Sequence, residues 1–513
     1  MRSASHDPVP FLRAAAAALR PQSALVRVIG DAFSKRTRVE AGRLAWTRRG
    51  RARFIGRAIV PMESVQSYFD RKQREISLLN ACLRQPIPFG PARTVSAIVE
   101  QKFRLAAALK AQQTLDHWAF TETAWTEEKE FRSGPFRFCY DYQRAGLRVS
   151  GPPVYEALAS IPQNYFQRTI YTSSGMAAIS ALLGALEQLN KPLEVIAFPG
   201  TYGETLELME GYSRNLRLQR LTNWRQSKAQ SIGYKVVWID CCIGSMAFQD
   251  VLNSPTHPFD LIVFDTTGLW VGSGRIQRVL NWAIGTGAPI VLLRSHTKLD
   301  SLGVEYGRLG SLVFVGTPEW KLAEGGSLEC ISEQVANAVR LFGGTAVPAH
   351  FPPFIGNSNY ACLGRQRIAA MLHNSRRIRK RLRIVMPSAE LDFVHGLYVA
   401  LMPDNALTQQ QAKKLAETMC RDLAVLGLPV HHAGSFGFDF AAAEWFRDLA
   451  RDRHLVRVAV PDLPTELWNH LVREIIQWWN RNAGSPSSRA GMLQNTYHRG
   501  HTQVWRMSAN TMI

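Results

Sequence analysis

The sequence lacks the cysteine patterns that build metal sites or disulfide frameworks. Its seven cysteines are scattered, with no C-x-x-C pair and no histidine at zinc spacing. We interpret them as reduced, buried thiols and expect a cytoplasmic protein. The seven are Cys82, Cys139, Cys241, Cys242, Cys330, Cys362 and Cys420.

Long apolar runs, internal repeats and a helix-turn-helix pattern are also missing. No stretch approaches the ~20 apolar residues that a membrane-spanning helix needs. Apolar content of 46% with 20% charged residues is ordinary for a soluble globular protein. We therefore expect a soluble chain without a membrane partner.

Acidic residues are scarce relative to basic ones, 41 against 61, which leaves a formal net charge of +20. Much of the excess lies in residues 1–60 and in the cluster at 376–383. Such charge attracts nucleic acid, an anionic surface or an anionic substrate. A solvated basic face is the alternative that we favour. The Arg-, Ala- and Ser-rich start also resembles a transit peptide.

The 513 residues are enough for two to three domains, and four segments differ in pattern. Residues 1–130 are predicted to form a mostly helical, basic N-terminal extension. A large domain is predicted at 131–350 and a smaller C-terminal domain at 351–482. The tail at 483–513, rich in Ser, Gly, Asn and Arg, is predicted to be disordered.

From about residue 165, short apolar runs alternate with amphipathic stretches, which predicts an α/β fold with a largely parallel sheet. In such sheets ligands bind outside the carboxyl ends of the strands. The predicted strands of the large domain are 193–198, 235–239, 261–264, 290–293 and 312–315, with helices at 176–189 and 276–284. In the small domain we expect strands at 396–402 and 455–460 and helices at 408–426 and 465–479, after a helical, basic region at 365–383.

A lysine flanked by hydroxyls follows one of these strands, in the segment Ser295-His296-Thr297-Lys298. A lysine at the mouth of a buried strand can form a Schiff base with an aldehyde cofactor, while the hydroxyls bind the cofactor's phosphate. Taken alone, such a lysine is more often simply solvated.

Three further segments carry matching chemistry. Ser174 caps a predicted helix, and Gly175 lets a ligand approach the free amides at its start, which suits an anion. Asp265 ends a buried strand, where a carboxylate needs a partner such as a protonated pyridine nitrogen; a turn aspartate is the alternative. Tyr202 follows another strand and can stack on a flat cofactor, unless it serves only in packing.

Taken in order, these segments resemble those of fold type I pyridoxal phosphate enzymes. They are most similar to the Cys/Met metabolism group, which includes cystathionine γ-synthase, cystathionine lyases and methionine γ-lyase. The group's Ser-Ser-Gly-Met stands intact at 173–176, and its Tyr-Gly-Gly-Thr is similar to Tyr-Gly-Glu-Thr at 202–205. Its Asp-Asn-Thr appears as Asp-Thr-Thr at 265–267, and its Ser-x-Thr-Lys ends at Lys298.

Further matches extend the resemblance to roughly residues 135–480. Tyr142-Gln143-Arg144 is similar to the group's Tyr-Ser-Arg, which reaches the phosphate of a neighbouring subunit. The segment at 455–460 resembles Leu-x-Arg-Leu-Ser-Val, whose arginine, here Arg457, binds the substrate carboxylate. Ser435 opens a segment similar to a Ser-Leu-Gly turn of the group.

The resemblance implies an aspartate-aminotransferase-like fold, a pyridoxal 5'-phosphate cofactor and a homodimer or homotetramer. It implies that Lys298 and Tyr202 act on the substrate's protons and that Asp265 keeps the cofactor ring protonated. Arg457 and Ser435 are the implied substrate contacts. The residues implied to hold the phosphate are Ser174, Gly175, Met176, Ser295 and Thr297, with Tyr142 and Arg144 from a partner subunit.

The implied reaction is elimination or replacement at Cβ or Cγ of an amino-acid substrate, through an external aldimine. Two departures bear on the substrate: 298–305 differs from the group's Lys-Tyr-x-x-Gly-His-Ser-Asp, and Glu204 replaces a glycine. Glu204 either contacts a cationic substrate group or simply favours the first turn of its helix. An aminotransferase is the nearest alternative, and a binding protein that uses the basic N-terminal region is another.

Overall fold

The computed structural model describes residues 63–118, 130–139, 148–151, 154–189, 191–221, 233–253, 259–321, 326–385, 394–402, 405–448 and 453–483. The predicted basic segment at 1–60 and, except for Ala483, the predicted tail lie outside these residues. No helix in this described part is long and apolar enough to cross a membrane.

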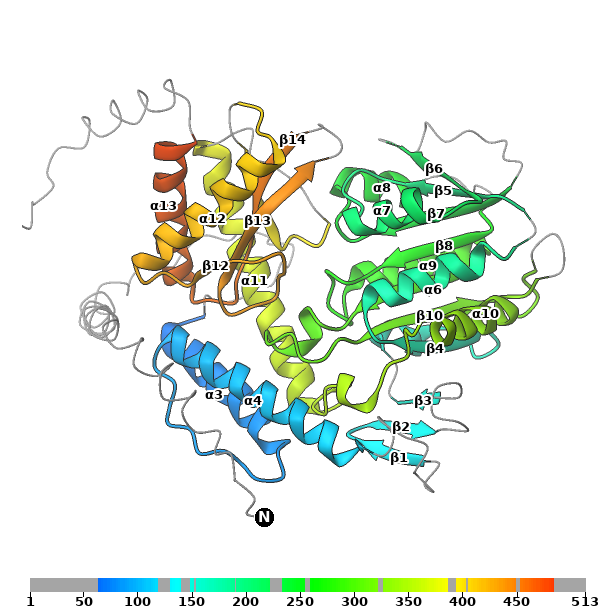
Figure 1. The fold of residues 1–513 in the computed structure, drawn as a ribbon, viewed down its shortest axis with the longest axis horizontal. Coiled ribbons are helices and arrows are strands. Elements are labelled where there is room, and N and C mark those ends of the chain that lie inside the picture. The colour runs from blue at the N-terminus through cyan, green and yellow to red at the C-terminus, as the bar shows by residue number, and fades with distance from the viewer. Residues whose placement is uncertain are drawn as a thin grey trace, which may run out of the picture.

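The described part of the large domain contains a seven-stranded sheet with the strand order β4-β10-β9-β8-β7-β5-β6 (Figure 1). Only β10 runs antiparallel to its neighbours β4 and β9, and the other pairings are parallel. The strands are β4 (Phe166–Thr172), β5 (Leu193–Ala197), β6 (Leu216–Arg220), β7 (Tyr234–Asp240), β8 (Leu261–Asp265), β9 (Ile290–Ser295) and β10 (Gly310–Gly316). The predicted α/β class with a mostly parallel seven-stranded sheet is confirmed.

The central strands are apolar throughout because both faces of the sheet are covered. Every residue of β5, β7, β8 and β10 is buried. Along β7, Val237 and Ile239 face one core while Val236 and Trp238 face the other. Because both faces are buried, these strands are continuous hydrophobic runs in the sequence. The edge strands β4 and β6 are only half-buried, and neither was predicted.

Helices cover the sheet on both sides and make a three-layer domain. One core contains side chains of α6 (Gly175–Leu186), α7 (Gly203–Tyr212) and α10 (Leu328–Leu341). The other contains side chains of α8 (Ser245–Asn253) and α9 (Gly274–Thr286), with the short 3-10 helix η1 (Glu156–Ser160). The loops at the carboxyl ends of the parallel strands stay uncovered by these helices.

The smaller C-terminal α/β domain is confirmed as well. Its sheet has the order β11-β14-β13-β12, packed under α12 and α13. Its elements are α11 (Ser358–Val385), β11 (Tyr398–Leu401), α12 (Gln409–Val425), β12 (Val430–His432), β13 (Ala441–Asp448), β14 (Arg453–Ala459) and α13 (Thr465–Asn482). The basic cluster lies on α11, where Arg376, Arg377 and Lys380 are exposed while Ile378 and Leu382 enter the core.

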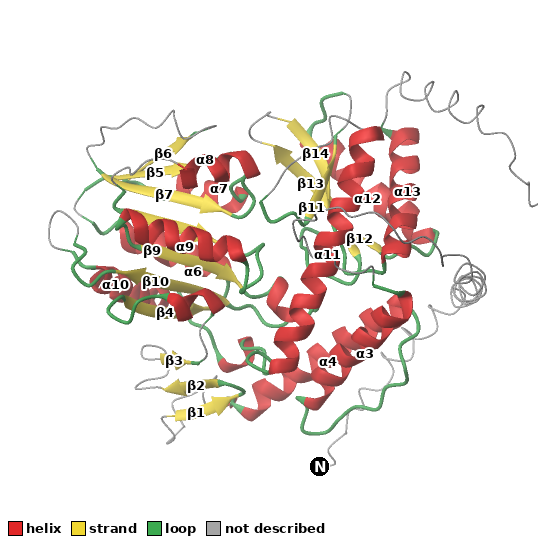
Figure 2. Cartoon of the chain, turned by 180° about the vertical axis from the view of Figure 1, so that it is seen from behind, coloured by secondary structure: helices red, strands yellow, loops and turns green. Residues whose placement is uncertain are grey.

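Two N-terminal helices, α3 (Val65–Ala81) and α4 (Val95–Asp116), lie beside α11 (Figures 1 and 2). Ser64 and Thr94 cap them by accepting a hydrogen bond from a first-turn amide. They pack on a core shared with Trp270 and Tyr306 of the large domain. A separate three-stranded sheet consists of β1 (Glu130–Ser133), β2 (Phe136–Cys139) and β3 (Arg148–Ser150), and a short 3-10 helix, η4, spans Pro348–His350.

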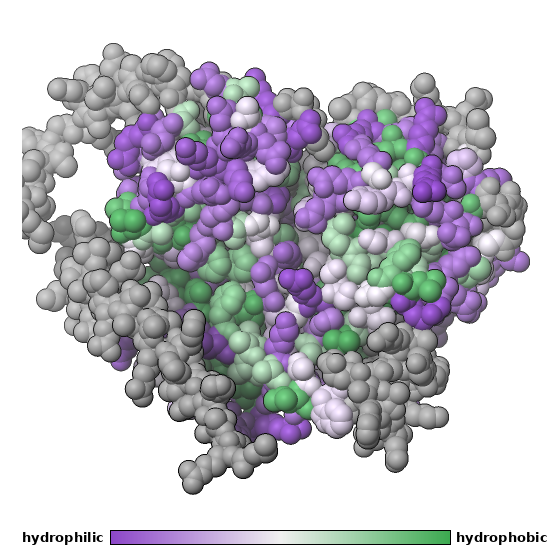
Figure 3. Space-filling model, in the orientation of Figure 1, coloured by the Kyte–Doolittle hydropathy of each residue, from purple (hydrophilic) through white to green (hydrophobic). Residues whose placement is uncertain are grey.

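Helix α4 carries apolar side chains on its outer face as well as on its buried one. Phe103, Leu115 and Trp118 are exposed at or just beyond this helix. Figure 3 shows hydrophilic residues over most of the small domain, whereas hydrophobic residues gather below it, over the N-terminal helices. The outer face of α4 is therefore more apolar than an ordinary solvated helix face.

A cluster of buried charged side chains joins the N-terminal helices to the small domain. We call it the buried ion cluster; each member is at most 2% exposed. Arg71 donates two hydrogen bonds to Asp462, at 2.7 and 2.8 Å. Lys102 donates to Asp439 at 2.6 Å. The members are Arg71, Lys72, Glu75, Lys102, Arg367, Asp439 and Asp462.

Charge balance keeps these groups ionised in spite of burial. Burial by itself raises the pKa of Glu75, but Arg367, Lys102 and Lys72 outweigh it and lower that pKa. The four cations of the cluster face three carboxylates, and the half-buried Glu63 supplies a fourth through Arg71. A buried charge is tolerated when it is paired and hydrogen-bonded in this way.

We predict that Glu75→Gln lowers the free energy of unfolding by about 3–5 kcal/mol, because it leaves four buried cations with only two buried carboxylates. Glu100→Gln is the matched control, since Glu100 forms an exposed pair with Arg104 on α4. Its effect should stay within about 0.5 kcal/mol. Denaturant unfolding followed by circular dichroism measures both. Equal stability of the two variants would show that the cluster contributes little.

Candidate functional site

The candidate site lies at the carboxyl ends of the parallel strands, where an open α/β sheet binds ligands. Because these strands run in the same direction, the residues at and just after their carboxyl ends lie along this one edge of the sheet. Tyr202 follows β5, Asp265 ends β8 and Ser295 ends β9. Asp240, which ends β7, lies directly opposite Asp265 in the strand register. The sequence analysis identified all of these except Asp240.

Lys298 connects the large domain to the small one. It precedes the short 3-10 helix η3 (Leu299–Ser301), and its Nζ donates to Ser435 Oγ at 2.7 Å. The same Nζ donates to Glu305 Oε1 at 3.3 Å, and Ser435 donates to that oxygen too. The structure thus brings together the predicted residues Lys298 and Ser435, and adds Glu305, which was noted only as a departure from the family pattern.

The segment that carries Glu305 has an unusual backbone. Leu302 and Glu305 have positive φ angles of 54° and 47°, and Gly303 between them has 86°. Left-handed backbone is strained for residues other than glycine and is held in place by the surrounding structure. Glu305 is therefore placed against Lys298 by a fixed turn.

Buried polar groups beneath the lysine hold its strand end in place. His296 Nδ1 lies 2.8 Å from Asp300, and its Nε2 lies 2.8 Å from Ser311 Oγ. Arg294 donates two hydrogen bonds to Asp300, each at 2.6 Å. Burial by itself raises the pKa of Asp300, but Arg294 outweighs it and lowers that pKa. These residues position the segment at 295–298 and do not face the site.

The start of α6 has the features of an anion site. Ser174 caps the helix by accepting a hydrogen bond from Ala177 N at 3.0 Å, and no acidic residue lies in the first turn. Gly175 packs on Ser295 so closely that a Cβ would come within 2.9 Å of the serine Cβ. The Ser295 hydroxyl makes no hydrogen bond within the described residues. Met176 lies in the same turn and packs on the adjoining core.

Thr297 contributes little to the internal structure. Its hydroxyl lies 3.5 Å from the carbonyl oxygen of Gly307, at the limit of a hydrogen bond. Thr297 is half-buried, so its hydroxyl can turn toward a ligand.

Asp265 and Asp240 form a pair of buried carboxylates. Asp265 Oδ1 accepts a hydrogen bond from Thr267 N at 2.8 Å, so it also acts as a turn aspartate. Burial raises the pKa of Asp265. Burial, followed by repulsion from Asp265, raises the pKa of Asp240 to about 7. Because burial disfavours both negative charges, a cation at this place would be bound well.

Asp240 also positions the ring-stacking candidate. Its Oδ2 accepts a hydrogen bond from Tyr202 N at 3.0 Å, and its Oδ1 accepts one from Cys242 N at 2.7 Å. Tyr202 precedes α7, with its side chain 37% exposed at the site. Burial, and then the neighbouring Glu204, raises the pKa of the Tyr202 hydroxyl. Glu204 lies in the first turn of α7 and interacts with Tyr202, which agrees with a role at the helix start; its contact with a cationic substrate group stays a prediction.

Arg457 lies on β14, directly opposite Glu444 on β13. Its Nε donates to Glu444 Oε1 at 2.6 Å, and its Nη2 donates to the same oxygen. It stacks on Tyr398, which packs in a core with Leu299 and Cys242 of the large domain, so Arg457 lies on the small-domain side of the site. The predicted carboxylate-binding arginine thus already has a carboxylate partner that the sequence analysis missed.

Tyr142 and Arg144 lie outside the described residues, so their implied role at a partner's phosphate stays a prediction. Within the described residues, two groups of side chains have metal-ligand spacing. One is Asp240 with Cys241 and Cys242 at the end of β7, and burial raises the pKa of the Cys241 thiol. The other is the carboxylate trio of the buried ion cluster, which lysine and arginine side chains already fill.

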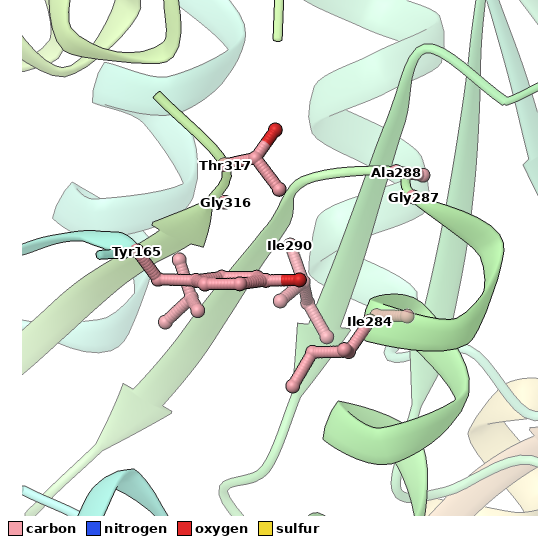
Figure 4. A pocket seen from close by; sticks show the side chains of 9 residues that line it. Tyr165, Ile284, Gly287, Ala288, Ile290, Gly316 and Thr317 are labelled. Carbon is pink, nitrogen blue, oxygen red and sulfur yellow. The ribbon is translucent and has the colours of Figure 1, made fainter. Parts of the chain in front are cut away.

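A small apolar hollow occurs at the opposite edge of the sheet (Figure 4). It is lined by the start of β9, the end of β10 and the end of α9, with Ile290, Gly316 and Ile284 among its walls. Tyr165 and Thr317 supply its side-chain hydroxyls, and no charged side chain lines it. Its chemistry does not match that of a reactive site.

We predict a distinct pH dependence for Asp240→Asn. An aspartate in an unfolded chain has a pKa near ~3.9, so the raised pKa of Asp240 stabilises the folded protein at low pH. This stabilisation is lost as the pH rises through about 7. The variant should therefore gain stability relative to wild type by up to about 1 kcal/mol per pH unit between pH 5 and 7. Thermal unfolding at several pH values measures this gain.

Asp250→Asn, on the exposed side of α8, is the control for that experiment. Its difference from wild type should stay constant across the same pH range. If the difference for Asp240→Asn were equally constant, the pKa of Asp240 would not be raised in the folded protein.

No protein-family model matches the chain, and no curated protein sequence matches it. Among solved structures, metB from Corynebacterium glutamicum is 14% identical, covering 78% of this chain and 97% of its own, with a TM-score of 0.46. Cystathionine gamma synthase from Xanthomonas oryzae, in complex with cystathionine, is 17% identical over 72% and 98%, with a TM-score of 0.42. Alanine aminotransferase from Pyrococcus furiosus is 13% identical over 61% and 76%, with a TM-score of 0.40.

Proposed function

We propose that the protein is a pyridoxal 5'-phosphate-dependent enzyme that acts on an amino-acid substrate by elimination or replacement at Cβ or Cγ. One observation carries the proposal. A lysine amino group, a buried strand-end carboxylate and an uncommitted helix N-terminus lie at the same edge of the sheet, at Lys298, Asp265 and Ser174. These are the three groups that the sequence resemblance assigns to this cofactor.

The site residues fit the cofactor on independent grounds. The buried Asp265–Asp240 pair favours a cation such as a protonated ring nitrogen, while Arg294 nearby is already paired with Asp300. The amides at the start of α6 and the free Ser295 hydroxyl suit a phosphate. Tyr202 presents its ring at the same edge.

When bound, pyridoxal phosphate supplies an electron sink for negative charge at the substrate's Cα. Lys298 is the residue that would hold the cofactor and then move a proton at Cα. Asp265 would keep the ring nitrogen protonated. The Tyr202 hydroxyl is protonated at neutral pH, and the upward shift of its pKa keeps it so; it would donate that proton to a leaving group at Cβ or Cγ.

The small domain supplies the remaining contacts. Ser435 holds the Lys298 amino group and would guide it between the cofactor and the substrate. Arg457 would bind the substrate carboxylate. We also propose a cytoplasmic homodimer or homotetramer in which Tyr142 and Arg144 of one subunit complete the phosphate site of another.

We predict that borohydride reduction of the protein with bound cofactor fixes a pyridoxyl group on Lys298, identified by peptide mapping. Lys298→Ala should abolish the label and lower turnover by about 10²–10⁴-fold or more, since it removes the proton-transferring group. Lys413→Arg, an exposed change on α12, should alter neither. A protein that takes up no pyridoxal phosphate would refute the proposed function.

The reaction type is tested by product analysis with amino acids that carry a leaving group at Cβ or Cγ. Elimination or replacement should release the side-chain group, and this release should fall in Tyr202→Phe, which lacks the proton-donating hydroxyl. The fall should be about 10²-fold, the lower range for removal of a general acid. Formation of a keto acid together with pyridoxamine phosphate, without side-chain release, would identify an aminotransferase instead.

A further inference from the structure

The guanidinium of Arg457 is held in place on three sides. Glu444, on the neighbouring strand, accepts hydrogen bonds from its Nε and Nη2 groups. The ring of Tyr398 lies under the guanidinium at 4.5 Å, and that of Phe446 lies at 4.9 Å. Stacking of this kind is typical of arginine and fixes the orientation of the guanidinium plane. Only Nη1 makes no hydrogen bond within the described residues.

Glu444 is part of the sheet and not a passing surface contact. The register of β13 and β14 sets Glu444 directly opposite Arg457, so the pair follows from strand pairing. The Arg457 side chain is 10% exposed and that of Glu444 is 20% exposed. Glu444 also lies against Gly434, where a Cβ would come within 2.5 Å of its Oε2. The carboxylate is therefore confined next to the arginine.

This arrangement changes what Arg457 can do for a ligand. A carboxylate that approaches Nη1 meets a guanidinium whose charge Glu444 already balances, and it meets Glu444 as a like charge. A carboxylate that takes Nε and Nη2 must displace Glu444, which then loses its buried partner. In both cases Glu444 weakens binding of a carboxylate, while a neutral carboxamide at the same place is affected much less.

We propose that Glu444 is a specificity-determining residue that lowers the preference of the site for ligands with a free carboxylate at Arg457. The inference rests on the proposed function in that the ligand is an amine-bearing amino acid or its derivative. Wild-type protein then accepts amino-acid derivatives without a free carboxylate almost as well as the amino acids themselves.

The test is titration calorimetry with L-methionine, which has a free carboxylate, and L-methioninamide, which has a neutral carboxamide at the same position. Wild type and Glu444→Gln are compared with and without added pyridoxal phosphate. We expect Glu444→Gln to raise the preference for methionine over methioninamide by at least about tenfold. Glu444→Asp, which withdraws the charge by one methylene, should shift the preference in the same direction by a smaller factor.

Glu130→Gln is the matched control, because Glu130 forms an exposed pair with Arg137 on neighbouring strands away from the site. It should leave the preference unchanged. An unchanged or reduced preference in both Glu444 variants, or no binding of either ligand to any of the proteins, would overturn the inference. Failure of the proposed function is seen separately, as absence of the pyridoxyl label on Lys298.

Discussion

The buried ion cluster is the constraint on which the arrangement of the molecule depends. Its members come from α3, α4, α11 and two loops of the small domain, so no single element can move without exposing a charge. Removing one ion from such a cluster leaves buried charges of the opposite sign in excess. The N-terminal helices are thereby tied to the small domain by electrostatics as well as by apolar packing.

The same cluster reaches the candidate site through one short loop. Arg367 donates to Asp439 at 2.7 Å and to the carbonyl oxygen of Gly437 at 2.7 Å. Gly437 has a φ of +92°, and a Cβ there would come within 3.1 Å of the Lys298 carbonyl oxygen. Ser435, two residues earlier, holds the lysine amino group. The cluster thus fixes the loop that sets the position of Lys298, even though it lies outside the site.

The sequence analysis placed most residues of the candidate site at one edge of the sheet, because buried parallel strands are easy to recognise and end at a common edge. Asp265 and Lys298 could be placed by counting from apolar runs alone. Asp240 had the same signal, a polar residue after the run at 235–239, and was overlooked. Glu444 had none, since its contact with Arg457 depends on the register of two strands, one of which was not predicted. The charged residues of α3 gave no signal of the buried ion cluster, because only tertiary packing shows that Lys72 and Glu75 are buried.

The charges at the site show a common pattern. Two described basic side chains to which the family resemblance assigns chemistry each contact a glutamate: Lys298 contacts Glu305, and Arg457 contacts Glu444. A third glutamate, Glu204, interacts with the Tyr202 hydroxyl. Isolated cations would draw in any anion, whereas paired ones bind only a ligand whose contacts exceed those of the resident carboxylate. A chain with a formal net charge of +20 therefore presents a site in which carboxylates outnumber the two named cations, and on our proposal selectivity there depends on exchange of ion-pair partners and not on overall attraction.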